Sequence, residues 1–134
     1  MCRADHPLAQ QPTVHWRDLA GQPLVLLDHA SGSRRLIDRA LEQHAPACQV
    51  VQQVGHTTTI FSMVQAGLGI TVVPRLAWAE QGGDSASLVH RPLLPTVERQ
   101  VMLVHRRHRK LAPMVQLVWD VVRDVAHARR GGRP

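Results

Sequence analysis

Short apolar runs alternate with amphipathic, helix-like segments along most of the 134-residue chain. The run Pro23–Leu27 follows Gly21 and is apolar without interruption, which is typical of a strand buried on both faces. The next segment, 34–42, has apolar residues three and four positions apart with charged residues between them, and Pro46 lies where a helix would have to stop. Strand–helix repetition of this kind predicts an α/β fold with a mostly parallel, mixed sheet flanked by helices.

The rest of the chain continues this alternation. Gln49–Val54 is a second strand-like run, and the helix expected after it extends to Ala66, where Gly67 is placed to end it. The further elements that we expect are a strand at Gly69–Val73, a short helix at Arg75–Ala79, a loop at Gln81–Ser85, strands at Leu88–Leu93 and Arg99–His105, and a final helix from Ala112 to about Ala128. That final helix has the strongest amphipathic pattern, and residues 129–134 form a basic tail that we expect to be disordered.

The basic net charge does not by itself indicate a nucleic-acid-binding surface. The formal charge at pH 7 is +6, but all except one of the 16 basic residues are Arg, and much of the excess lies in 106–110 and in the tail. The chain has one Phe, three Trp and no Tyr, so it lacks the basic stripe with interleaved aromatic residues that single-strand-binding proteins use. We therefore expect no direct, specific contact between this chain and nucleic acid.

The sequence shows neither an apolar membrane-spanning run nor a secretory signal, and this bears on cellular location. It has no run of about 18 apolar residues, so no segment is long enough to span a membrane. Its first residues contain no apolar stretch of the kind found in secretory signals. Cys2 and Cys48 are far apart and match no metal-ligand spacing, which favours free thiols in a reducing compartment. We expect a cytoplasmic protein that does not contact membranes.

Two groups of residues contain the components of catalytic motifs, but in both groups the arrangement is wrong. Gly67 and Gly69 follow a helix and precede a strand, whereas a dinucleotide-binding loop follows a strand and precedes a helix. Asp28, His29 and Ser31 are the residue types of a hydrolase triad, but triad members reach one another from separate elements, and these three are near neighbours in sequence. We therefore expect no enzymatic activity.

The nine His residues do not indicate a metal site. His105 and His108 are three positions apart, but no Cys or carboxylate cluster accompanies them at a ligand spacing. Solvated polar side chains account for them better than a structural metal does. We expect neither a metal nor another cofactor.

One segment resembles a motif of a known protein family. Residues 64–77 read VQAGLGITVVPRLA and resemble the V-x-A-G-x-G-[IV]-x-x-[LV]-P segment in the effector-binding domain of LysR-type transcriptional regulators. Three other pieces agree with this family in the same order, namely DHPLA at 5–9, WRDLAGQPLV at 16–25, and the stretch 93–109 that closes with LAP at 111–113. The resemblance therefore covers about residues 3–127.

The resemblance implies a fold like that of the type 2 periplasmic binding proteins, at about half its usual extent. Residues 1–128 would form a partial effector-binding domain, with the second lobe at about 21–95, a crossover strand and C-terminal helix at 99–128, and an incomplete first lobe. In the family, the last helix packs on the first lobe, and a helix-turn-helix domain, absent from this chain, binds promoter DNA. The implied function is to sense a small metabolite as part of a homo-oligomer and to relay that signal to DNA.

Two segments, 28–34 and 55–58, lie where an expected strand ends and an expected helix begins. Ligands of open α/β sheets bind at this edge, and helix N-termini present unpaired N–H groups that suit a carboxylate. The family's effector cleft lies at the same edge, so the resemblance implies that both segments face the effector. The residues that we expect to contact a small, anionic effector are Asp28, His29, Ser31, Gly32, Ser33, Arg34, Gly55, His56, Thr57 and Thr58.

Alternative explanations stay open both for the individual site residues and for the function of the whole protein. Ser and Thr often cap their own helices, so Ser31 or Ser33 could serve only as an N-cap. Arg34 is the nearest full positive charge, and it either pairs with a carboxylate in a bidentate manner or lies in solvent as a first-turn residue. For the whole protein, the alternatives are a solute-binding protein of a transporter with the same fold, or an enzyme that reuses the fold.

We predict that this chain alone does not bind promoter DNA specifically. It contains no helix-turn-helix candidate, and its basic residues would give only weak attraction that salt screens. The measurement is a footprint titration at physiological salt. A protected, defined site under those conditions would contradict the prediction.

Overall fold

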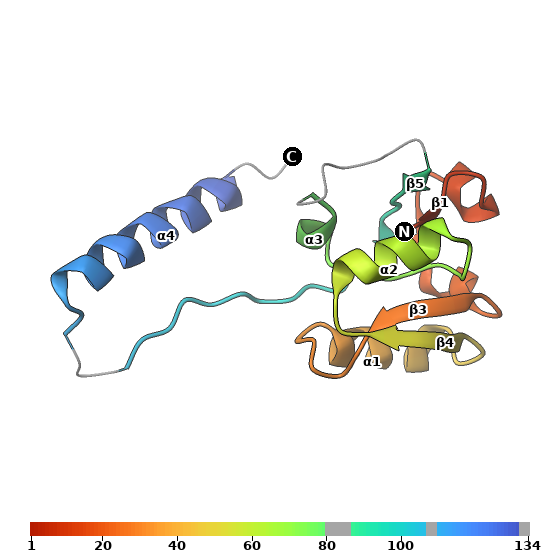
Figure 1. Cartoon of the computed structure of the whole chain (residues 1–134), viewed down its shortest axis with the longest axis horizontal. Coiled ribbons are helices and arrows are strands. Elements are labelled where there is room, and N and C mark those ends of the chain that lie inside the picture. The colour runs from red at the N-terminus through yellow and green to blue at the C-terminus, as the bar shows by residue number, and fades with distance from the viewer. Residues whose placement is uncertain (80–86, 107–109, 132–134) are drawn as a thin grey trace. The chain divides into compact units, whose positions relative to one another are not determined.

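The computed structural model describes residues 1–79, 87–106 and 110–131, with side chains described as far as residue 128 (Figure 1). The chain forms two compact units, Met1–Arg99 and a second that begins at Gln100, and each is described by itself. The elements are β1 (Cys2–Arg3), the 3-10 helix η1 (Pro7–Gln10), β2 (Val14–His15), the 3-10 helix η2 (Trp16–Leu19), β3 (Pro23–Leu27), α1 (Arg34–His44), β4 (Gln49–Val54), α2 (Thr57–Gln65), α3 (Arg75–Ala79), β5 (Leu88–Val89), β6 (Leu93–Leu94) and α4 (Pro113–Gly131).

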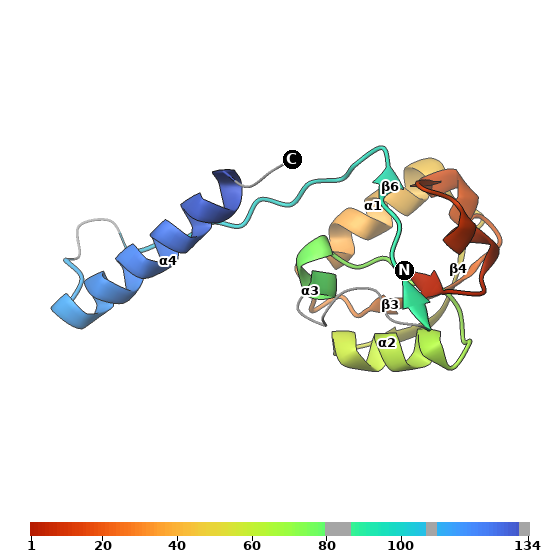
Figure 2. The ribbon, with the colours of Figure 1, turned by 90° about the horizontal axis from the view of Figure 1, so that it is seen from above.

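Strand β3 lies at the centre of the first unit. Three consecutive side chains, Leu24, Val25 and Leu26, have no solvent exposure, as the uninterrupted apolar run predicts. Because successive side chains of a strand point to opposite faces, Leu24 and Leu26 join one hydrophobic cluster and Val25 joins the other. Helices α1 and α2 cover these two faces from opposite sides in both views of the ribbon (Figures 1 and 2).

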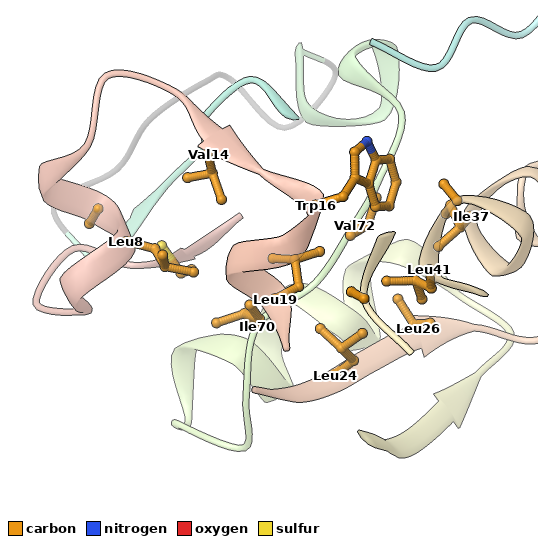
Figure 3. Packing of buried hydrophobic residues seen from close by; sticks show 14 residues of the cluster. Leu8, Val14, Trp16, Leu19, Leu24, Leu26, Ile37, Leu41, Ile70 and Val72 are labelled. Carbon is orange, nitrogen blue, oxygen red and sulfur yellow. The ribbon is translucent and has the colours of Figure 1, made fainter. Parts of the chain in front are cut away.

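The larger cluster packs α1 and the N-terminal segment against one face of β3. Leu24 and Leu26 of β3 belong to one cluster with Ile37 and Leu41 of α1 and with Trp16 and Leu19 of η2 (Figure 3). The Trp16 ring is buried, and its Nε1–H donates to the Pro95 carbonyl at 2.9 Å. Full burial of each large apolar side chain contributes roughly 1.5–3 kcal/mol. The burial of α1 and η2 against β3 therefore stabilises the position of β3 and of the loop that follows it.

The α/β class and the dominance of parallel strand pairing are confirmed. β3 pairs with β4 and β2 pairs with β6, both in parallel, while β1 pairs with β5 in an antiparallel manner. The strands form three two-stranded ladders rather than one continuous sheet. Helices α1, α2 and α3 lie where the sequence places them, and Gly67 follows α2 with a φ of 84°, the left-handed conformation that commonly ends a helix.

The third expected strand, Gly69–Val73, forms a single bridge instead of a ladder. Ile70 pairs with Leu24, accepting from the Val25 N–H and donating to the Pro23 carbonyl, both at 2.9 Å. The next residue, Thr71, exchanges backbone hydrogen bonds with Met1 on the other side. The pairing therefore changes partner after one residue, which is too short a run for a strand.

Two other expected strands are wrong in extent. Leu88–Leu93 divides into β5 and β6, which pair with different partners, because Pro92 has no N–H to extend a ladder. Arg99–His105 is neither helix nor strand in the described part of the chain, and its apolar side chains, Val101 to Val104, are exposed. A strand needs a neighbour for its N–H and C=O groups, and the described residues provide none for this segment. The loop expected at 81–85 lies outside the described residues.

Helix α4 forms as expected and carries its apolar stripe on an exposed face. It extends through Gly131, so residues 129–131, which we assigned to a disordered tail, are helical, while 132–134 lie outside the described residues. The side chains of the stripe are 45% to 73% exposed, and they are Met114, Val115, Leu117, Val118, Val121, Val122 and Val125. Despite this apolar face, no helix in the described ranges meets the length and hydrophobicity needed to span a bilayer.

Gly69→Ala should strongly destabilise the first unit. Gly69 has a φ of 155°, and a Cβ there would lie 2.3 Å from the Pro23 carbonyl oxygen, which accepts the Ile70 hydrogen bond. We expect the free energy of unfolding to fall by about 3 kcal/mol. The control is Gly67→Ala, where φ is also positive but nothing lies within 4 Å; its expected cost is about 1–2 kcal/mol. Chemical denaturation measures both, and equal losses would show that the close contact is unimportant.

The exposed stripe of α4 should make the chain self-associate, because contiguous apolar surface of this kind is normally covered. Analytical ultracentrifugation at micromolar concentration should show species larger than a monomer. Val121→Glu, on the stripe, should reduce association, whereas His127→Glu, on the polar side of the same helix, should not. A chain ending at Lys110 should be monomeric and more soluble. A monodisperse monomer of the full chain would refute this prediction.

Candidate functional site

The two predicted loops lie side by side at the carboxyl edge of β3 and β4. The parallel register pairs Leu27 with Val54, and the Asp28 N–H continues it by donating to the Val54 carbonyl at 3.0 Å. An Asp28 carboxylate oxygen lies 3.4 Å from the position that a Cβ on Gly55 would occupy. Segments separated by more than twenty residues in sequence therefore meet at one edge, which the strand–helix pattern predicts.

The first loop is held in shape mainly by its own polar groups. Asp28 accepts from the Ala30 N–H through its carboxylate at 3.0 Å and from the Ser31 N–H through its carbonyl at 3.1 Å. The Ser31 and Ser33 hydroxyls are hydrogen-bonded to each other at 2.9 Å. Ser33 is the N-cap residue of α1, but its side chain makes no capping hydrogen bond. Capping by Ser33 therefore does not explain the two serines.

His29 projects from this loop and is mostly exposed, with its Nδ1 at 3.7 Å from an Asp38 carboxylate oxygen. The Asp28 carboxylate is directed to a backbone N–H and the Ser31 hydroxyl to Ser33. The three side chains that share residue types with a hydrolase triad therefore have separate partners and do not form a relay. Gly32 lies at the exposed tip of the loop.

The second loop presents its polar groups to solvent. His56 is the N-cap residue of α2, and its side chain makes no capping hydrogen bond. Gly55, His56 and Thr58 are exposed, and Thr57 is half-buried at the first position of the helix. Because the first N–H groups of a helix have no partner within it, this loop offers backbone donors beside the Thr hydroxyls. The arrangement suits a ligand with anionic or carbonyl oxygens.

Arg34 lies inside the protein, so the hypothesis of a solvated first-turn residue is wrong. Its side chain is only 4% exposed. Its Nη1 donates to the Leu27 carbonyl at 2.5 Å and to Gln53 Oε1 at 2.9 Å, and its Nε donates to Asp38 at 2.7 Å. The guanidinium therefore bonds to protein groups below the loops.

Arg99 is a cationic residue near the site that sequence reasoning missed. One of its terminal nitrogens lies 3.8 Å from the position that a Cβ on Gly32 would occupy, so its guanidinium reaches the tip of the first loop. Its side chain is exposed. No local pattern indicates this placement, because Arg99 follows Gly32 by more than sixty residues and belongs to a segment expected to be a strand.

Among the residues that the structure describes, the cysteines and metal-ligating side chains form no second candidate site. Cys2 and Cys48 are free, and burial raises the pKa of both thiols, which disfavours the reactive thiolate. Across residues 1–79, 87–106 and 110–131, no three His, Cys, Asp or Glu side chains are grouped closely enough to hold a metal ion. His108 lies outside the described residues.

The parallel pairing of β3 with β4, and the loops that lead from these strands into α1 and α2, define an α/β domain. The structure is similar to the regulatory domain of CcmR from Synechocystis PCC6803, solved in complex with 2-PG, with a TM-score of 0.74 and 18% sequence identity over 92% of this chain and 60% of that one. This likeness supports the type 2 periplasmic-binding-protein-like fold. The family model for the LysR substrate binding domain matches residues 1–127, and the chain belongs to that family.

Curated relatives agree with this family. An uncharacterized HTH-type transcriptional regulator of Shigella flexneri, YfeR, is 45% identical over 133 residues, which is 99% of this chain and 42% of that protein. The transcriptional dual regulator GltC of Bacillus subtilis is 30% identical over 119 residues, 88% of this chain and 39% of that protein. The chain thus spans about two fifths of the length of these relatives.

Proposed function

We propose that this chain is part of the effector-binding domain of a LysR-type transcriptional regulator, and that its two loops contact a small, anionic metabolite. The observation that carries the proposal is the meeting of segments 28–33 and 55–58 at the carboxyl edge of a parallel strand pair, in a member of this family. The structural neighbour with the same fold was solved with 2-PG, which supports a small-molecule ligand.

The chemistry of the loops favours recognition of an anion by hydrogen bonds. Thr57, Thr58 and the first N–H groups of α2 supply neutral donors, and the positive end of the helix dipole adds to them. Arg99 replaces Arg34 as the cation that we propose for pairing with the ligand, because Arg34 already bonds to three protein groups. The negative charge of Asp28 would repel an anionic ligand. Its carboxylate accepts a hydrogen bond from the Ala30 N–H within the loop, which partly offsets that charge.

The proposed activity is regulatory and not enzymatic. A ligand bound at these loops would favour one of two conformations of the regulator. The DNA-binding domain of the intact protein would respond to the change in the populations of these conformations. We propose that the regulator is a cytoplasmic homo-oligomer that reaches promoter DNA through its helix-turn-helix domain. The alternative of a solute-binding protein is not favoured, because the matched relatives are transcriptional regulators.

Calorimetric titration of the intact regulator with 2-PG, inorganic phosphate and citrate tests the site. For whichever probe binds, Thr57→Val should weaken affinity several-fold, because loss of a neutral hydrogen bond costs about 0.5–1.5 kcal/mol. Arg99→Gln should weaken it about tenfold or more, because a hydrogen bond to a charged group contributes about 1.5–3 kcal/mol. The control is Arg39→Gln, an exposed arginine of α1.

The same variants should shift the effector response of promoter binding without changing promoter affinity in the absence of effector. If Thr57→Val and Arg99→Gln both bind the probe as tightly as the wild type does, the two loops are not the ligand site. Weakening by Arg39→Gln to the same extent would show a non-specific effect of charge.

A further inference from the structure

We propose that Arg34 is a positioning residue that sets the spacing of the two loops without contacting the ligand. The inference rests on the proposed function of the loops at 28–33 and 55–58. It assigns to Arg34 a role different from that of the exposed polar residues around it, because its hydrogen bonds join the two strands that end in those loops.

A single guanidinium nitrogen connects the ends of both strands. Nη1 of Arg34 donates to the carbonyl of Leu27, the last residue of β3, and to the side chain of Gln53, the last residue but one of β4. The residue after Leu27 is Asp28, which opens the first loop, and Val54 and Gly55 follow Gln53. A change in either bond would therefore alter the separation of the two loops at their origin.

The charge of Arg34 is balanced within the protein. Nε donates to an Asp38 carboxylate oxygen at 2.7 Å, one helical turn along α1, and the other oxygen lies 3.7 Å from His29 Nδ1. A buried charge is tolerated only when it is paired and hydrogen-bonded. Because the three acceptors hold the guanidinium from β3, β4 and α1, its position is fixed relative to all three elements.

The pairing of β3 with β4 is irregular, and the β4 side chains contribute little burial to it. The register shifts between Leu24 and Val25, so the ladder is not continuous. Gln49 to Gln53 of β4 are all exposed, so little burial holds this strand in place. Arg34 bonds both strands at the end of the ladder beyond this irregularity, where the loops begin.

The test is hydrogen-exchange mass spectrometry of the intact regulator. Arg34→Gln should speed exchange in peptides covering 28–33 and 54–58 by about tenfold, as expected for loss of local hydrogen bonds, without affecting α2 beyond its first turn. Arg34→Lys keeps the charge for Asp38 but cannot bond in the same fork geometry, so it should fold with a lower melting temperature and still show faster loop exchange. Arg39→Gln is the matched control and should change neither.

Gln53→Ala decides the outcome if Arg34→Gln does not fold, because Gln53 is exposed and its loss removes one acceptor only. It should speed exchange in the second loop. Wild-type exchange of both loops in Arg34→Lys and in Gln53→Ala would overturn the proposal. So would an Arg34→Lys variant that weakens probe binding with unchanged loop exchange, since that result would make Arg34 a ligand contact.

A binding measurement separates this inference from the proposed function. Where 2-PG or phosphate binds the wild type, Gln53→Ala should lower its affinity several-fold, although Gln53 is not among the residues expected to contact the ligand. If no probe binds, or if loop variants leave binding unchanged, the proposed ligand site fails, while the exchange data still decide whether Arg34 positions the loops.

Discussion

Burial of β3 on both faces is the constraint on which the first unit depends. Leu24, Val25 and Leu26 have no exposed surface, so apolar cover is required above and below the strand. Helix α1 with η2 supplies one cover and α2 supplies the other, and the connections from β3 to α1 and from β4 to α2 lie at the carboxyl edge. The two polar loops occur at that edge because the chain has to turn there from strand to helix on each side.

Those parts of the fold that local pattern controls could be predicted from the sequence. The apolar run of β3, the amphipathic spacing of α1 and the glycine after α2 each specify an element through neighbouring residues alone. Expected strands at Gly69–Val73 and Arg99–His105 did not form as ladders, because a strand depends on partners that its own residues do not specify. Ile70 and Thr71 find different partners on their two sides, and the described residues offer none to the second segment.

In the candidate site, too, some features follow from local sequence pattern and others depend on tertiary contacts. That Asp28 and Gly55 would meet follows from two parallel strands that each precede a helix, and both family resemblance and pattern agree on it. The environment of Arg34 could not be inferred, because a charged residue in the first turn of a helix is ordinarily solvated, and only the folded chain shows three acceptors around it. The approach of Arg99 to Gly32 is likewise a tertiary contact with no local sequence signal.

The separation between buried scaffold and exposed loop side chains bears on how ligand choice can diverge during evolution. His29, Gly32, His56 and Thr58 are exposed, whereas Leu24 to Leu27 of β3 and Arg34 are buried, and β3 pairs with β4 through backbone hydrogen bonds. Substitutions at these exposed positions should change the chemistry of this edge with little effect on folding. Under the proposed function, ligand preference and folding stability would therefore depend on different residues of this domain, so that either property could change while the other is kept.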